Sequence, residues 1–300
     1  MTGLYDIRNP QFGRLVHKNA RLEQLWTGGR WCEGPAYVPA GKYLIWSDIP
    51  NDRVLRFDET DGSVSTFQSP CGNQNGHILD RSGRLVACEH QGRCVSRIEH
   101  DGMRSVIADH FMGKRLNSPN DVVVKSDGTV WFSDPTYGID SDYEGDAASS
   151  EIGKSQVYRV EGDGTITAAV TDMVQPNGLA FSPDERLLYV ADTGRSHKPD
   201  CLPKIRAYPV REDGMSLGPG ADFIVCDNGA FDGFRVDTNG NLWCSAGDGV
   251  HCFTPAGELL GKIRVPEVVS NLCFFGPKRN RLAICATSSL YAVYVNARGL

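Results

Sequence analysis

The sequence predicts an all-β protein, a six-bladed β-propeller with four-stranded antiparallel blades around a central channel. Short apolar runs alternate with Gly- and Asp-rich turns along the whole chain, and no window supports a long amphipathic helix. In six successive units, an oxygen-bearing residue also stands seven positions before a tight turn. We call these six residues the mouth ring: Glu33, Asn75, Asn120, Asn177, Asp232 and Asn271.

The third unit shows how each blade is built. Residues 122–124 and 129–132 are β-rich runs on either side of Ser126-Asp127-Gly128, a typical hairpin turn. A third and a fourth run follow at 156–160 and 165–167, so the unit is predicted to be a four-stranded meander of about 40 to 55 residues. Equivalent hairpins are predicted, in chain order, at 36–38 with 43–46, 179–181 with 187–190, and 234–236 with 241–244.

Two segments depart from the repeat, within what we expect to be a single domain spanning residues 1–300. The stretch from 1 to about 30 lies outside the six units, and we expect it to supply an outer strand that closes the circle with the last unit. Residues 139–154 contain Asp140, Asp142, Glu144 and Asp146 among small residues, which is typical of a polar loop. This insertion in the third unit is expected to cover the channel mouth.

The composition excludes several function classes. A net charge of −6, a pI near 5.7 and the absence of a Lys/Arg-rich run disfavour nucleic acid as a partner. No segment resembles a signal peptide or a membrane span, so a cytoplasmic monomer or homodimer without a membrane partner is expected. Ten cysteines without a CxxC pair, several of them inside apolar strands, are expected to be reduced structural thiols.

The position of the mouth ring indicates a metal site. The first strands of all blades run in the same direction along a propeller channel, so residues at their starts meet at one mouth. Carboxylate and amide oxygens suit Ca²⁺, while Mg²⁺, Mn²⁺ and Zn²⁺ are alternatives. We predict one divalent cation bound by Glu33, Asn120, Asn177 and Asp232. Asn75 and Asn271 could contact the cation or instead pack as polar channel residues.

Neighbouring positions extend this prediction. The second strands return to the same face and are expected to deliver an outer polar ring of Asp48, Glu89, Asp134 and Asp192. At three glycines that directly follow mouth-ring residues, we expect the missing side chain to let the backbone approach the cation or ligand closely. They are Gly76, Gly178 and Gly233.

At these residues the chain resembles the calcium-dependent lactonases of the senescence-marker-protein, gluconolactonase and luciferin-regenerating-enzyme family, and the bacterial gluconolactonases above all. The likeness extends from about residue 22 to the end. It is carried by the order and spacing of Glu33-Gly34-Pro35, Gln74-Asn75-Gly76-His77, Lys114-Arg115-Leu116-Asn117-Ser118-Pro119-Asn120-Asp121, Trp131-Phe132-Ser133-Asp134-Pro135-Thr136-Tyr137-Gly138, Pro176-Asn177-Gly178-Leu179-Ala180-Phe181 and Phe231-Asp232-Gly233.

The resemblance implies a six-bladed propeller with one divalent cation at the channel mouth and hydrolysis of a sugar lactone. Glu33, Asn177 and Asp232 match the family's metal ligands, and Asn120 matches an Asn that contacts metal or substrate. Where the animal branch has an Arg two residues before that Asn, this chain has Ser118. Arg115 is the nearest substitute for substrate binding.

The predicted reaction is the opening of glucono-1,5-lactone or a related aldonolactone by a metal-polarised carbonyl and an activated water. Asp232, as the only Asp of the mouth ring, is the candidate general base. His77 could orient water or substrate, and Tyr137 could contact a sugar hydroxyl, although both could equally be packing groups. A calcium-dependent phosphotriesterase-like hydrolase and a non-catalytic propeller with a structural cation are the alternatives.

Overall fold

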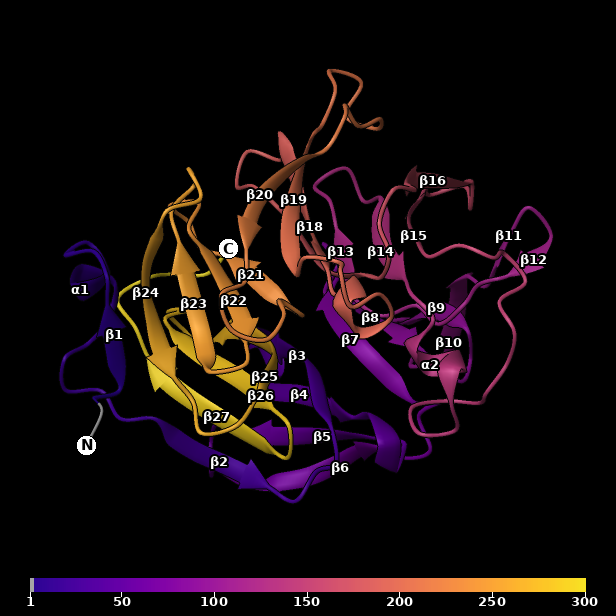
Figure 1. Ribbon diagram of the computed structural model, residues 1–300. Helices are drawn as coiled ribbons and strands as arrows, with labels where there is room; N and C mark the ends of the chain where they lie inside the picture. Colours follow the sequence, from indigo (N-terminus) through magenta and orange to yellow (C-terminus); the bar gives the residue numbers. More distant parts are fainter. Residues whose placement is uncertain (1–2) are drawn as a thin grey trace.

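The computed structural model describes residues 3–300 and shows six antiparallel β-sheets arranged as blades around a central channel (Figure 1). In each blade the strand that comes first in the repeat is innermost, and its successors follow outward by hairpins. The all-β, six-bladed propeller predicted from the sequence is confirmed.

The blades have the following strands. The first contains β3 (Cys32–Val38), β4 (Tyr43–Asp48), β5 (Arg53–Asp58) and β6 (Val64–Gln68), and the second contains β7 (Gln74–Leu79), β8 (Leu85–Glu89), β9 (Cys94–Ile98) and β10 (Arg104–Ala108). The third contains β13 (Val122–Val124), β14 (Val130–Asp134), β15 (Gln156–Val160) and β16 (Ile166–Val170), and the fourth contains β17 (Pro176–Phe181), β18 (Leu187–Asp192), β19 (Lys204–Pro209) and β20 (Ala221–Val225). The fifth contains β21 (Phe234–Val236), β22 (Leu242–Ala246), β23 (Gly249–Phe253) and β24 (Leu259–Arg264), and the sixth contains β25 (Val269–Phe275), β26 (Arg281–Ala286) and β27 (Ser289–Tyr294).

The N-terminal segment completes the last two blades. Strand β2 (Glu23–Thr27) pairs antiparallel with β27 as the outer strand of the sixth blade, and β1 (Tyr5–Ile7) pairs with β24 as a fifth strand of the fifth blade (Figure 1). Between them, the short helix α1 (Phe12–Leu15) buries Phe12 completely in the core shared by these two blades. Residues from opposite ends of the chain therefore share two sheets.

The remaining elements are short connections. A two-stranded hairpin, β11 (His110–Phe111) with β12 (Lys114–Arg115), joins the second and third blades, and the helical turn α2 (Tyr137–Asp140) begins the insertion in the third. Three 3₁₀ turns complete the chain: η1 (Pro39–Gly41), η2 (Ile49–Asn51) and η3 (Gly194–Ser196). Within residues 3–300, no helix is both long and apolar enough to span a bilayer.

The core lies between adjacent blades rather than in one central layer. Trp131 of the third blade packs edge-on against Phe181 of the fourth, with ring centroids 5.4 Å apart, and Trp243 of the fifth meets Phe274 of the sixth in the same way at 6.0 Å. Each tryptophan is fully buried. All ten cysteines are free thiols and nine are buried, as expected for structural thiols.

The predicted outer polar ring has a bracing role in three blades. Asp48, Asp134 and Asp192 end the second strands and accept backbone N–H groups from the loop just before the first strand of the same blade. Those donors are the amides of Arg30, Asn117 and Gln175, at 2.9, 2.9 and 3.0 Å. Each carboxylate thus fixes the entry of an inner strand by satisfying a buried donor.

The corresponding residue of the second blade has other partners. Glu89 accepts two hydrogen bonds from the guanidinium of Arg104, at 2.8 and 2.7 Å, and one from the hydroxyl of Ser96 at 2.5 Å. Glu89 thus joins three strands of one blade through Arg104 and Ser96, instead of fixing the entry loop.

Asp134 should make stability depend on pH. It is fully buried with Oδ1 unpartnered, and burial raises its pKa to about 7, although the backbone N–H of Asn117 and, more weakly, the Arg93 guanidinium lower it. A carboxyl whose folded pKa lies above its unfolded value stabilises the fold at low pH, and that stability is lost as the pH rises from about 4 to about 7. The full effect is about 4 kcal/mol at 1.36 kcal/mol per pKa unit.

The variant Asp134→Asn should remove this dependence. Urea unfolding of both proteins between pH 4 and pH 8 should show that the free energy of unfolding of the variant increases relative to that of the wild type as the pH rises. Asp163→Asn, in an exposed turn, controls for the change in net charge and should follow the wild type closely. A stability difference between Asp134→Asn and wild type that stays constant with pH would contradict the assignment.

Candidate metal and active site

The mouth-ring residues stand where the inner strands begin. In four blades the pairing of the inner strand shifts register at this point, as between Glu33 and Ala36 in β3 and between Gln74 and His77 in β7. Such bulges redirect side chains and are frequent next to functional sites. In the third and fifth blades, Asn120 and Asp232 lie two residues before the strand and are held by backbone N–H bonds to Ser133 and Ser245.

Two carboxylates, from the first and fifth blades, lie near enough at this mouth for the charge of one to act on the other. Glu33, from the first blade, accepts the amide Nδ2 of Asn271 at 2.9 Å and its neighbour's backbone N–H at 2.6 Å. The side chain of Asn177 lies close enough to Asp232, from the fifth blade, to lower the pKa of its carboxyl. We call Glu33 and Asp232 the carboxylate pair. The structure therefore brings four of the six mouth-ring residues together as two couples, Glu33 with Asn271 and Asp232 with Asn177.

The carboxylate pair is electrostatically strained. Burial, with the charge of Asp121 next in importance, raises the pKa of Glu33 to about 8. Burial and the charge of Glu33 raise the pKa of Asp232 well above its usual range. Glu33 is 3% exposed, whereas Asp232 keeps part of its surface accessible. Two deeply placed carboxylates that disfavour each other's ionisation are stabilised by a bound cation.

Asp121 is a site residue that the sequence analysis missed. It is 1% exposed, and its Oδ2 lies 3.4 Å from Nδ2 of Asn271 and 3.5 Å from Nη1 of Arg235. Asp121 and Arg235 thus connect the third, fifth and sixth blades across the channel, directly beside Glu33. The sequence did carry a signal for it. The residue directly after the mouth-ring residue is Asp in this unit, whereas it is Gly in four other units.

The glycines after the mouth ring have a different role from the one expected. A Cβ on Gly178 would lie 2.2 Å from the carbonyl oxygen of Asp232, and one on Gly76 would lie 2.6 Å from that of Asn120. A Cβ on Gly233 would meet the side chain of Asn271 at 2.0 Å. The missing side chains therefore admit the inner strand of the next blade, rather than a ligand. The close approach sets the spacing of the mouth ring itself.

His77 lies behind the mouth ring. It is 1% exposed, and its ring nitrogens contact the carbonyl oxygen of Gly34 at 2.8 Å and the side chain of Gln74 at 3.1 Å. Burial lowers its pKa to about 4, so the ring is neutral at physiological pH. Both nitrogens are engaged by protein groups, which favours a brace between the first two blades. Its part in substrate binding stays a prediction.

Asn120, Tyr137 and Arg115 differ in their proximity to the carboxylate pair. Asn120 is 5% exposed, and its carbonyl accepts the N–H of Gly76. Tyr137 is close enough for the charge of Asp232 to contribute to its raised pKa, which is due mainly to burial. Arg115 instead lies exposed on β12, at the outer edge of the propeller, and donates to the carbonyl of Gly92 (Figure 1).

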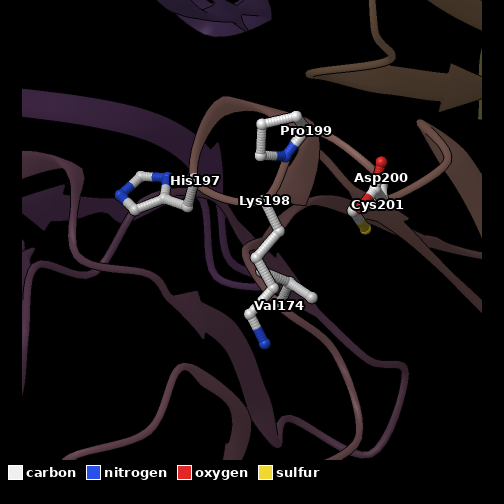
Figure 2. A pocket seen from close by; sticks show the side chains of 6 residues that line it. All are labelled: Val174, His197, Lys198, Pro199, Asp200 and Cys201. Atoms are coloured by element: carbon white, nitrogen blue, oxygen red, sulfur yellow. The ribbon is translucent and has the colours of Figure 1, made fainter.

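A pocket of about 510 Å³ lies beside Tyr137. It is lined by the loop of the fourth blade that follows β18, together with Val174, and Figure 2 shows the side chain of Lys198 extended alongside Val174. His197 of this loop meets the Tyr137 ring edge-on at 5.5 Å and lies 2.8 Å from a carboxylate oxygen of Asp140. The loop and α2 therefore form one joined wall beside Tyr137.

The donors at the mouth fit a hard divalent cation. Among residues 3–300, no three or more His, Cys, Asp and Glu side chains gather as a metal site, so a site here must combine the carboxylate pair with amide oxygens. The neighbours that set the pKa of the pair are carboxylates, amides and a backbone N–H. Oxygen donors with two negative charges suit Ca²⁺. Glu33, Asn177 and Asp232 could hold the ion, with Asn120 nearby in the ring.

Comparison with known proteins identifies the family of the chain. The family model described as SMP-30/Gluconolactonase/LRE-like region matches residues 31–288. The chain belongs to this family. Within the family, it is 31% identical to the gluconolactonase of Zymomonas mobilis over 97% of this chain and 86% of that protein.

Solved structures of relatives superimpose closely. A gluconolactonase from Xanthomonas campestris is 36% identical, with a TM-score of 0.90 over 97% of this chain and 94% of that one. A protein described only provisionally as a gluconolactonase is 40% identical, with a TM-score of 0.91 over 99% of both chains. The backbone that carries the mouth ring is thus shared with these relatives.

Proposed function

We propose that the protein is a lactonase that hydrolyses a sugar lactone, glucono-1,5-lactone or a related aldonolactone, at the carboxylate pair with one divalent cation, Ca²⁺ in preference to Mg²⁺, Mn²⁺ or Zn²⁺. The observation that carries the proposal is the pair itself, two deeply placed carboxylates with amide partners at the channel mouth. The lactonase names of its relatives in this family support the choice of substrate class.

The residues can perform each part of the reaction. When bound, a dication supplies Lewis acidity at the lactone carbonyl. Asp232 is partly accessible and is held by Asn177, so it can take a proton from a water that attacks the carbonyl carbon. As the C–O bond of the ring breaks, the same carboxyl returns that proton to the leaving oxygen. With a dication bound, Glu33 would be held ionised as the second negative charge of the pair.

The variant Asp232→Asn tests this assignment. It keeps the size and an oxygen donor but removes the proton acceptor, so kcat for glucono-1,5-lactone should fall about 10²–10⁴-fold. Calcium affinity, measured by calorimetry, shows whether the metal is still bound in the variant. Near-normal turnover and an unchanged pH–rate profile with calcium bound would exclude Asp232 as the base.

A substrate panel tests the reaction class. Aldonolactones should be hydrolysed only with divalent cation present, and chelation should abolish the activity reversibly. Including a fluorophosphate in the panel distinguishes a phosphotriesterase-like hydrolase, which would act on it instead. Calcium binding without turnover of any substrate would favour a non-catalytic propeller.

A further inference from the structure

Asn75 carries an unpartnered oxygen at the channel mouth. This mouth-ring residue of the second blade is 3% exposed, and its Oδ1 is buried without a hydrogen-bond partner. Its Nδ2 lies 3.2 Å from Nε2 of His90. A buried acceptor left unpaired is costly, and in a functional site it indicates a group that a ligand completes.

The donors and acceptors around His90 determine which end of the Asn75 amide faces it. Nδ1 of His90 faces two acceptors of Glu144, the carbonyl oxygen at 3.1 Å and a carboxylate oxygen at 3.9 Å, so the ring proton belongs on Nδ1. His90 is fully buried and burial lowers its pKa to about 4, which keeps the ring neutral. Nε2 is therefore a bare acceptor, and only the amide N–H of Asn75 can face it.

The opposite edge of the Asn75 amide then faces away from His90. Asn75 lies inside the register shift between Gln74 and His77 at the start of β7, which is the mouth-ring position of its blade, and we place the free edge at the mouth on that basis. His90 itself is clamped, since a Cβ added to Gly138 of α2 would lie 2.5 Å from its side chain. The insertion thus holds the imidazole from two sides, through α2 and through Glu144.

We infer that Asn75 is a substrate-binding residue whose Oδ1 accepts a hydrogen bond from a hydroxyl of the sugar lactone, and that His90 and the Glu144 carbonyl are the positioning groups that aim it. The inference rests on the proposed function. The amide of Asn75 is engaged by His90, whereas the carboxylate pair has Asn177, Asn271 and Asp121 as neighbours and feels Glu144 of the insertion as a further charge. We therefore assign its oxygen to substrate rather than to the cation.

Three variants of the full chain test the inference with calcium present. Asn75→Leu removes the acceptor at similar volume, and His90→Leu removes the group that aims it. His90→Gln is the matched control, because its amide can accept from Asn75 and donate to the Glu144 carbonyl, as the imidazole does. Calcium affinity, thermal unfolding, KM and kcat for glucono-1,5-lactone, and affinity for D-gluconate are measured for each.

We expect KM to rise and D-gluconate affinity to fall about tenfold in Asn75→Leu and His90→Leu, with wild-type calcium affinity and near wild-type values for His90→Gln. The double variant Asn75→Leu/His90→Leu should lose no more than Asn75→Leu alone, because both changes remove one interaction. Equal gluconate affinity in all proteins, or weakened calcium binding in Asn75→Leu, would overturn the inference. Lack of lactone turnover by the wild type would overturn the proposed function instead, since gluconate affinity is measured without turnover.

Discussion

Replacing Gly178 by alanine should destabilise the protein by about 3 kcal/mol or more and lower kcat/KM about 10²-fold. The new Cβ would lie 2.2 Å from the carbonyl oxygen of Asp232 and 2.8 Å from the Cα of Gly233. Backbone atoms cannot rotate away as a flexible side chain can, so the fourth and fifth blades must separate. Overpacking costs about 1–3 kcal/mol where the structure can adjust, and more where it cannot.

The effect on activity follows because the contact between the fourth and fifth blades positions site residues. Asn177 lies on β17 and Asp232 just before β21, so both would move as these blades separate, and a shift of about 1 Å in a reacting group can cost about 10²-fold in rate. Urea unfolding and lactone kinetics measure the two effects. Gly162→Ala is the control, because a Cβ there meets no atom within 4 Å. Wild-type stability of Gly178→Ala would show that the blades tolerate wider spacing.

The repeat was predictable because each unit has a recognisable local sequence pattern. Two apolar runs on either side of an Asp-Gly or Asn-Gly turn predict a hairpin without information from the rest of the chain. The predicted runs 122–124 and 234–236 coincide with β13 and β21. Strand β1 was not predicted because it is three residues long and forms only where β24 offers a free edge. Its partner lies more than 250 residues away in the sequence.

For the site, the sequence could predict only which position of each repeated unit lies at the channel mouth. Spacing placed Glu33, Asn177 and Asp232 at one mouth, since equivalent positions in equivalent blades must converge. It could not show that Asp121 reaches Asn271 and Arg235, because those contacts join blades that are far apart in sequence. Nor could spacing tell whether a glycine admits a ligand or a neighbouring strand, a choice decided by packing between blades.

Asn75 and Asn271 occupy equivalent positions but have different partners. Asn271 has its oxygen on a backbone N–H and its amide on Glu33 and Asp121, so its hydrogen-bonding capacity is used within the protein. Asn75 has its amide engaged and its oxygen unpaired. One mouth-ring amide therefore orients a carboxylate, while the other is available to a ligand. Residue type and spacing are the same for both, and only the neighbouring blades distinguish them.

Glu33→Gln should separate the stability of the fold from its function. In the metal-free protein, the ionised form of Glu33 is disfavoured by burial and by Asp121, which is why its pKa rises to about 8. Removing that carboxyl should stabilise the metal-free protein by about 3 kcal/mol at pH 7, from the shift at 1.36 kcal/mol per unit. The gain should grow as the pH rises from about 5 to 8, because a raised pKa means stability lost with increasing pH.

Calcium should reverse the order of the two proteins. A ligand stabilises the fold in proportion to its occupancy, so saturating calcium should raise the unfolding temperature of the wild type well above that of Glu33→Gln, whose donor set has one charge fewer. Lactone turnover by the variant should fall at least about 10²-fold. Glu212→Gln, an exposed carboxylate outside the mouth, should match the wild type with and without metal. If Glu33→Gln were less stable than wild type without metal, Glu33 would have to be a structural hydrogen-bond acceptor for Asn271 rather than a charge held in place for a cation.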